Sequence, residues 1–132
     1  SAAHAKAALP SLEQKQAAWD SVWVADDKPN LIVRATGLGF NKAHNLKVLE
    51  PFVKQYFDSI EKIWASRSYA IAEELVESYY PAPLANEALA EATRNYLKNS
   101  NPPAPLRRLI VENLAGTERT LAAQARDTKE SA

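Results

Sequence analysis

Cysteine and methionine are missing from the 132-residue chain, and histidine occurs only twice. The absence of cysteine excludes a disulfide framework, thiolate catalysis and cysteine-ligated zinc or iron–sulfur sites. His4 and His44 are 40 residues apart, and neither is followed by glutamate as in the His-Glu-x-x-His pattern of a helical zinc site. We therefore predict that this chain has no catalytic residue, no metal ligand and no cofactor of its own, and we expect His44 at an exposed loop position.

Also absent are a long apolar run and an excess of charge of either sign. No run approaches the roughly 18 consecutive apolar residues that a membrane helix needs, and no basic segment followed by an apolar one opens the chain as in a signal peptide. Sixteen Lys and Arg residues balance sixteen Asp and Glu residues, so no net positive potential attracts a polyanion. We predict a soluble protein with neither a membrane nor a nucleic acid as its partner.

The N-terminal end of the sequence begins with serine rather than methionine. We therefore expect that the sequence was processed or was cut from a longer polypeptide. Residues 1–10 are rich in alanine and end at Pro10, so they are predicted to be a leader, either a frayed helix or a disordered or tag-derived segment. Residues 11–132 are predicted to form one helical domain.

The residues that are abundant favour helix. Ala and Leu together number 38, against 12 for Val and Ile. This ratio favours helices because β-branched side chains lose more rotamer freedom in a helix than alanine and leucine do. No segment shows the alternation of polar and apolar residues that is typical of a strand. The predicted fold class is all-α.

Proline, glycine and polar clusters divide the sequence into segments with a helical apolar period. The predicted helices cover residues 12–24, 31–38, 46–60 with an apolar extension to Trp64, 69–79, 84–98 and 106–126. Ser11 and Gln14 form a capping box for the first helix, and Ser66 or Ser68 caps the fourth. Short breaks between helices imply antiparallel neighbours packed in pairs, in either an irregular bundle or a segment of a helical-repeat superhelix.

Proline and glycine also predict local geometry within these helices. Pro51 is expected in the first turn of a helix that begins near Leu49, because proline further inside kinks a helix. Gly37 and Gly39 lie near a predicted helix end, where a positive φ is common. Gly116 interrupts the last helix, which indicates a close helix approach or a local bend.

Apolar stripes on the helices predict the core. The stripe of the first helix includes Leu12, and that of the third includes Leu46. The aromatic residues are predicted to pack in the core or between helices. They are Trp19, Trp23, Trp64, Tyr56, Tyr79, Tyr80 and Tyr96.

Two further clusters have more than one interpretation. Gly37-Leu38-Gly39 lacks the third glycine and the preceding strand of a dinucleotide-binding loop, so a helix end is favoured. Glu73, Glu74 and Glu77 carry the carboxylates that a hard cation or acid–base catalysis needs, but a solvated helix face explains them better.

The densest basic group lies near the C-terminal end of the chain. It consists of Arg107, Arg108, Arg119 and Arg126. Acidic residues are interspersed, so a solvated face is favoured over an anion site. Arginine is nevertheless well suited to holding a peptide carboxylate through two parallel hydrogen bonds.

Several stretches carry a family resemblance. They are Ala17-Ala18-Trp19 before the Asp26-Asp27 break, residues 31–40 ending in Gly-Phe, Tyr56-Phe57 with Ile63-Trp64, Leu106-Arg107-Arg108-Leu109, and Ala123-Gln124-Ala125-Arg126-Asp127. Together they resemble the C-terminal helical domain of aminopeptidase N, a zinc metallopeptidase family of the gluzincin type, in its actinobacterial form. The resemblance covers residues 10–127, nearly the whole chain.

The resemblance implies a fold and a division of labour. Family members remove N-terminal residues from peptides with a zinc ion held by His-Glu-x-x-His and a further glutamate, and this chain contains no such motif. The C-terminal domain of the family is a HEAT- or armadillo-like superhelix of antiparallel helix pairs that bounds the peptide chamber. By this resemblance, residues 11–132 form the non-catalytic C-terminal domain of a larger cytoplasmic aminopeptidase, whose partners are the catalytic domain of the same polypeptide and peptide substrates. Arg107 and Arg119 are the predicted peptide contacts.

Two alternatives remain open at this point. The chain is alternatively a stand-alone helical module that binds another protein through an aromatic face, or a small helical enzyme with an unrecognised site. The poor inventory of nucleophiles and metal ligands makes the enzyme the weakest of the three.

Overall fold

A computed structural model describes residues 12–43 and 45–131, and every regular element in this part is helical. The elements in order are an α-helix over residues 12–19, η1 (Asp20–Val24), α2 (Asn30–Phe40), η2 (Leu46–Leu49), α3 (Glu50–Ser66), α4 (Tyr69–Ser78), η3 (Ala82–Leu84), α5 (Glu87–Asn99) and α6 (Ala104–Ser131). The predicted all-α class is confirmed. The predictions for the leader, His4, Ser11 and His44 lie outside the described residues.

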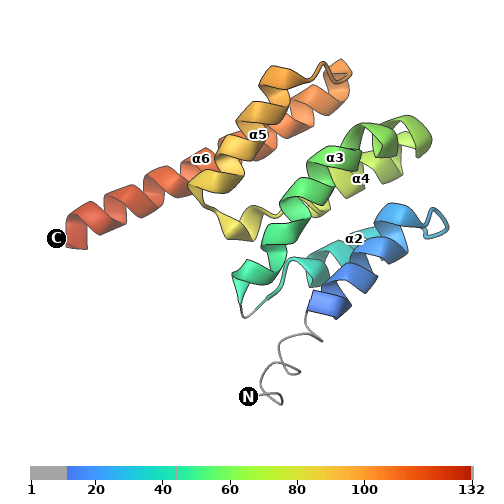
Figure 1. Ribbon diagram of the computed structural model, residues 1–132, viewed down its shortest axis with the longest axis horizontal. Coiled ribbons are helices and arrows are strands. Elements are labelled where there is room, and N and C mark those ends of the chain that lie inside the picture. Colours follow the sequence, from blue (N-terminus) through green and yellow to red (C-terminus); the bar gives the residue numbers. More distant parts are fainter. Residues whose placement is uncertain (1–11, 44, 132) are drawn as a thin grey trace, which may run out of the picture.

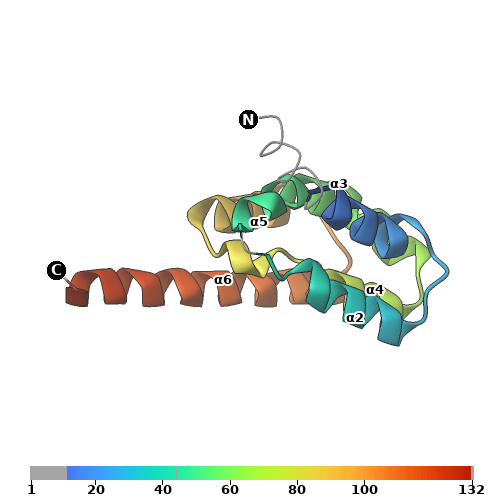
Figure 2. The ribbon, with the colours of Figure 1, turned by 90° about the horizontal axis from the view of Figure 1, so that it is seen from below.

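The helices form two layers. In Figure 2, residues 12–24, α3 and α5 lie in one layer, and α2, α4 and α6 lie in the other. Contacts within the layers join α2 to α4, α4 to α6 and α3 to α5, while α3 packs on α4 and α5 on α6 between the layers. Consecutive helices therefore pack in pairs, as predicted, and Figure 1 shows each member of a pair running back along the other. The HEAT- or armadillo-like superhelix stays a prediction.

Side-chain caps and proline decide where the helices begin. Pro51 lies in the first turn of α3, after the short η2 helix, as expected for proline at a helix start. Ser68 accepts a hydrogen bond from the Ile71 amide and caps α4, which confirms one of the two predicted caps. The predicted start of the fifth helix at residue 84 is wrong, because Leu84 ends η3 and α5 begins after Asn86, whose side chain accepts from the Leu89 amide at 2.8 Å.

The positive φ angles predicted for two glycines and the burial predicted for two leucines are also wrong. Neither Gly37 nor Gly39 has a positive φ, because α2 continues through both to Phe40. Lys15 Nζ donates to the carbonyls of Gly39 and Phe40 and so replaces a glycine cap at this helix end. Leu12 and Leu46, predicted to be buried, are exposed at the edges of their helices.

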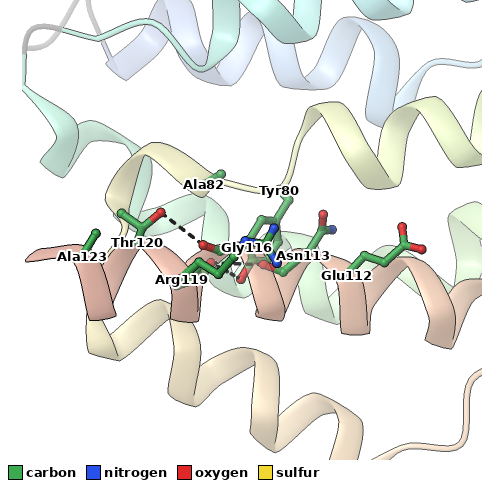
Figure 3. Close-up of a pocket in the computed structure, with 9 residues that line it drawn as sticks. Tyr80, Ala82, Glu112, Asn113, Gly116, Arg119, Thr120 and Ala123 are labelled. Atoms are coloured by element: carbon green, nitrogen blue, oxygen red, sulfur yellow. Dashed lines mark hydrogen bonds between the residues drawn. The ribbon is translucent and has the colours of Figure 1, made fainter.

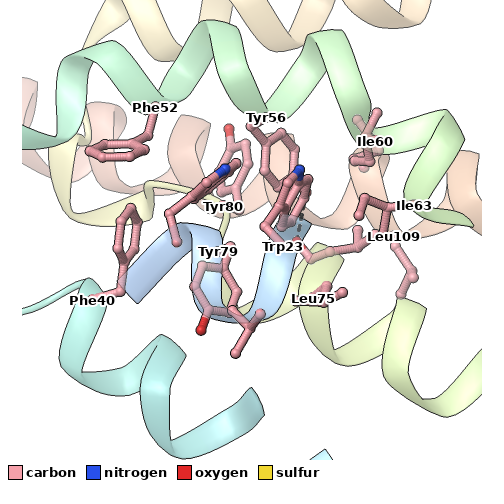
Figure 4. Close-up of a cluster of buried hydrophobic side chains, with 14 of the residues drawn as sticks. Trp23, Phe40, Phe52, Tyr56, Ile60, Ile63, Leu75, Tyr79, Tyr80 and Leu109 are labelled. Carbon is pink, nitrogen blue, oxygen red and sulfur yellow. Dashed lines mark hydrogen bonds between the residues drawn. The ribbon is translucent and has the colours of Figure 1, made fainter. Parts of the chain in front are cut away.

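Aromatic side chains fill the core where the two layers meet (Figure 4). Trp19 stacks on Trp23 with ring centroids 4.3 Å apart, and Phe40 meets Phe52 edge-on at 4.8 Å. Five of the seven aromatic residues predicted to be packed are fully buried, and the remaining two are half-buried against the core. The buried ones are Trp19, Trp23, Tyr56, Tyr79 and Tyr80, and the half-buried ones are Trp64 and Tyr96.

A buried arginine holds the end of the first helical segment. Arg67, with only 5% of its side chain exposed, donates to the carbonyls of Val22 at 2.9 Å and of Trp23 at 2.7 Å. These carbonyls belong to the last turn of η1, which has no further intrahelical partners for them.

None of the helices in residues 12–43 and 45–131 combines the length with the apolar composition that a bilayer crossing requires.

Candidate functional site

A groove of about 550 Å³ runs along α6 (Figure 3). One wall is formed by Tyr80 and Ala82, in and beside η3. The other is a single face of α6, whose residues recur at steps of one to three: Glu112, Asn113, Gly116, Thr117, Arg119, Thr120 and Ala123. We refer to these nine residues as the α6 groove. Because helical spacing places them on one side of α6, the groove follows the helix axis.

Gly116 forms the floor of the α6 groove. Apart from the neighbouring backbone of α6, a Cβ built at this position meets only Arg119 Nη2, at 3.7 Å, among the described residues. The predicted close helix approach is therefore wrong, and α6 runs through Gly116 from residue 104 to residue 131. The missing side chain instead widens the groove, at the cost of about 1 kcal/mol of helix propensity relative to alanine.

A buried chain of hydroxyl groups supports the wall opposite α6. Tyr80 Oη lies 2.9 Å from Thr93 Oγ1 and 3.0 Å from Thr117 Oγ1. Thr93 and Thr117 each donate their single proton to a carbonyl of their own helix, Thr93 to Leu89 at 2.7 Å and Thr117 to Asn113 at 3.3 Å, so the Tyr80 hydroxyl is the donor between the two threonine oxygens. Burial raises the pKa of the Tyr80 phenol above its usual value of 10.0, although the two threonine hydrogen bonds oppose the shift. Tyr80 is thus a fixed, neutral support at physiological pH.

The two ends of the α6 groove carry opposite charge. At one end Glu112 pairs with Arg108 at 3.2 Å, one turn earlier on α6. Toward the other end Arg119 is exposed and has no ion-pair partner among the described side chains of residues 12–43 and 45–129. Seven residues separate Glu112 from Arg119, which corresponds to about 10 Å along the helix axis. The groove therefore presents an uncompensated guanidinium beside the hydroxyl of Thr120 and the open floor at Gly116.

The second predicted contact, Arg107, lies elsewhere. It is half-buried near the start of α6, and its Nη2 donates to the Leu97 carbonyl in the last turn of α5 at 3.2 Å. This bond joins α5 to α6 across the turn between them. Twelve residues, or about 18 Å of helix, separate Arg107 from Arg119, so the structure does not bring the two predicted contacts together.

The acidic cluster on α4 is only partly solvated, because Glu77 is exposed whereas Glu73 and Glu74 are half-buried. Glu74 pairs with Arg34 on α2 at 3.3 Å. Burial raises the pKa of the Glu77 carboxyl, and the nearby charges of Glu73 and Glu74 raise it further. In the described part of the chain, no three or more His, Asp or Glu side chains gather into a group suited to a metal ion. The prediction that this chain holds no metal stays a prediction.

The sequence analysis identified Arg119 but missed the groove that surrounds it. Thr93, Thr117 and Tyr80 are scattered over 37 positions, and no local pattern indicates that their hydroxyl groups meet. The only available signal was Gly116, an otherwise unfavourable residue in the interior of a helix.

Comparisons with known proteins bear on the whole chain. The sequence profile of a family described as "ERAP1-like C-terminal domain" matches residues 1–119. Aminopeptidase N of Streptomyces lividans is 36% identical over 126 residues, which are 96% of this chain. The chain spans about 15% of the length of that relative.

Proposed function

Because the chain belongs to the ERAP1-like C-terminal domain family, we propose that it forms a non-catalytic wall of the peptide chamber in a zinc-dependent aminopeptidase N. The wall limits access to the chamber. Zinc and the water that attacks the first peptide bond belong to another part of the same polypeptide. The observation that carries this proposal is the 36% identity, over almost the whole chain, to a stretch that makes up only 15% of an aminopeptidase N.

Two structural features support the wall. The helices lie in two layers with successive members in alternate layers (Figure 2), an arrangement that builds extended, curved surfaces when it is repeated. The second feature is the α6 groove, which lies on a face of this wall and supplies polar side chains that contact the peptide. We also place the polypeptide in the cytoplasm, in keeping with a sequence that contains no cysteine.

Arg119 is the residue that we expect to contact the peptide. Its guanidinium lies in an open groove with no competing carboxylate in an ion pair, among the described residues. A guanidinium binds a carboxylate with two hydrogen bonds, and the length of about 10 Å from Glu112 to Arg119 matches roughly three residues of extended peptide. Arg107 is the weaker candidate, because one of its donors already binds the Leu97 carbonyl.

The test is peptide hydrolysis by the aminopeptidase polypeptide that carries this chain. We expect Arg119→Gln to raise KM for peptides of about ten residues by about tenfold, the effect of removing a hydrogen bond to a charged group. The KM for an aminoacyl-anilide should not change, since that substrate does not reach the wall. Gly116→Leu fills the groove and should act in the same direction.

Arg126→Gln is the matched control. Arg126 is an exposed arginine of α6 that does not line the α6 groove. If the two arginine variants have equal KM values for long peptides, the peptide contact at Arg119 is wrong. If the 132-residue chain alone hydrolyses an aminoacyl-anilide with added zinc, the division of labour between wall and catalytic domain is wrong.

One observation favours a second candidate, a stand-alone module that binds another protein. Leu31 and Leu38 on α2 are 75% and 62% exposed on one face of the helix, and neighbouring exposed apolar residues mark interaction sites on proteins. This candidate predicts a partner whose binding does not require a peptidase domain. Pull-down with the 132-residue chain, followed by competition with the purified catalytic domain, separates the two candidates.

A further inference from the structure

The two outer sides of the helix stack differ in polarity. On the α5 side, Arg94 forms an ion-pair network with Glu87 at 2.7 Å, Glu91 at 3.4 Å and Glu118 of α6 at 3.4 Å. On the α2 side, one face of the helix carries Leu31, Ala35 and Leu38, which are all exposed. We name these three residues the α2 stripe. Charged side chains thus cover one side of the stack, and apolar side chains are open to solvent on the other.

The α2 stripe is the face of α2 that is turned away from the rest of the fold. Val33, Gly37 and Phe40 bury the opposite face against α4 and the aromatic core. The stripe follows the spacing of one helical ridge, with the small Ala35 between two leucines, and this pattern accepts the ridge of another helix. No described residue covers it, as Leu31 and Leu38 stay mostly exposed.

Stacked helical units require polar faces at their true ends, because each inner unit buries its apolar faces against its neighbours. By this criterion the α5 side is an end and the α2 side is not. Within its layer α2 is followed by α4 and α6, so a further helix packed on the α2 stripe extends the same layer on the free side (Figure 2).

We propose that an amphipathic helix of the same aminopeptidase polypeptide, from the part that this chain does not span, packs on the α2 stripe. The proposal rests on the proposed function in needing a larger polypeptide. The matched relative has 85% of its length outside the matched stretch, which leaves ample chain for such a helix. A second copy of this chain fits less well, because a stable dimer buries roughly 800 Å² per partner, far more than three side chains of one helix present.

Cysteine accessibility tests the proposal, because the native chain contains no cysteine. Leu38→Cys places a thiol in the stripe, and Leu31→Cys provides a second probe in case the first variant folds poorly. Val111→Cys is the matched control, since Val111 is 46% exposed on α6, outside the stripe. Each variant is treated with a maleimide in the 132-residue chain and in the whole aminopeptidase polypeptide, and labelling at that position is followed by peptide mass spectrometry.

We expect the thiol of the Leu38→Cys variant to react at least about tenfold more slowly in the whole polypeptide than in the 132-residue chain, because a buried thiol reacts only after local opening. The thiol of the Val111→Cys control should react at similar rates in both. Equal rates for the Leu38→Cys thiol in both proteins overturn the proposal. Protection that already appears in the 132-residue chain also overturns it: if it grows with concentration the occupant is a second copy, and if deletion of residues 1–11 removes it the occupant is that segment.

The outcomes separate this inference from the proposed function. If the Leu38→Cys thiol stays reactive in the whole polypeptide while Arg119→Gln raises KM for long peptides, the stripe proposal fails and the wall function stands. If that thiol is protected while Arg119→Gln has no effect, the helix contact stands and the peptide contact fails.

Discussion

Gly37 and Gly116 each interrupt a helix with a missing side chain, but they serve opposite purposes. At Gly37 the α2 backbone approaches α4 so closely that a Cβ would lie 2.7 Å from Ser78 Cβ and 3.1 Å from Tyr79 Cε1. At Gly116 a Cβ would touch only the flexible end of Arg119, at 3.7 Å. One glycine permits contact between two helices, and the other leaves a groove open beside a single helix.

The difference extends to the surroundings of each glycine. Next to Gly37, Phe40 and Tyr79 join the aromatic core, whose rings pack against one another from four helical segments. Around Gly116 the α6 groove contains polar groups, and the C-terminal part of α6 projects from the body of the protein (Figure 2). The role of a glycine in a helix therefore depends on what lies opposite it. Opposite Gly37 is the closely packed α4 helix, and opposite Gly116 is the open space beside η3.

The largest expected effect is in the aromatic core. Trp19→Ala removes ring contacts to Trp23 at 4.3 Å and to Phe52 at 5.3 Å, and we expect it to lower the free energy of unfolding by about 3–5 kcal/mol. Urea denaturation followed by circular dichroism measures this. Leu121→Ala, at a half-buried position of α6, should lower it by less than about 1 kcal/mol. Equal losses of unfolding free energy for the two variants contradict the contrast between the aromatic core and the half-buried positions of α6.

Gly37→Ala has the next largest expected effect. The new methyl group collides with Ser78 Cβ, a rigid neighbour, so we expect a loss of about 1–3 kcal/mol despite alanine's better helix propensity. Gly39→Ala is the control on the same helix, because no atom lies within 4 Å of its Cβ position among the described residues. A thermal scan in which both variants melt together shows that α2 does not need this close approach.

Gly116→Ala is expected to change stability in the opposite direction. With space available for a methyl group, the gain in helix propensity should raise the free energy of unfolding by about 0.5–1 kcal/mol. Urea denaturation of this variant and of Gly37→Ala compares the two sites directly, since the same substitution is expected to stabilise the protein at one position and to destabilise it at the other. If Gly116→Ala instead lowers the free energy of unfolding, the floor of the α6 groove has no space for the added methyl group.

The smallest expected effect is a pH dependence of the free energy of unfolding, caused by Glu77 on α4 near Glu112 on α6. Burial, followed by the charges of Glu73, Glu74 and Glu112, raises the pKa of Glu77 above 4.5, while Arg108 lowers it. A raised carboxyl pKa favours the protonated folded state, so this stabilisation is present below pH 4.5 and is lost as the pH rises through the folded-state pKa.

Glu77→Gln replaces the carboxyl group with an amide that resembles the protonated form and stays uncharged at every pH. Relative to the native chain we expect it to gain less than about 1 kcal/mol at pH 7, because the group is mostly exposed, and nothing below pH 4. Urea midpoints at the two pH values measure the difference. A gain of equal size at both values shows that the effect is not one of titration.

Much of the fold is local enough to be predicted. The segments around α3, α4 and α6 follow from apolar spacing, and Ser68 and Pro51 mark helix starts because capping and proline geometry act within one turn. Prediction was wrong where a distant residue intervened. Lys15 holds the end of α2, which glycine was expected to terminate. At α5 the error was local, because Leu84 belongs to η3 and the helix begins only after its cap residue Asn86.

The candidate site was predicted only in part. Arg119 was chosen because arginine suits a carboxylate, and it lines the α6 groove. Arg107 was chosen on the same ground, yet its Nη2 donates to the Leu97 carbonyl. Sequence chemistry indicates what a side chain is able to bind, whereas its actual neighbours decide whether it is available.

By itself, the sequence determined that the protein is helical, where most helices lie and which aromatic side chains are buried, because propensity, capping and apolar period depend on residues within a few turns. Only the tertiary structure decided that Gly37 touches Ser78, that Tyr80 joins Thr93 to Thr117, and that the α2 stripe has no cover among the described residues. These features depend on which distant segments meet, and meeting is set by the packing of whole helices rather than by any local pattern.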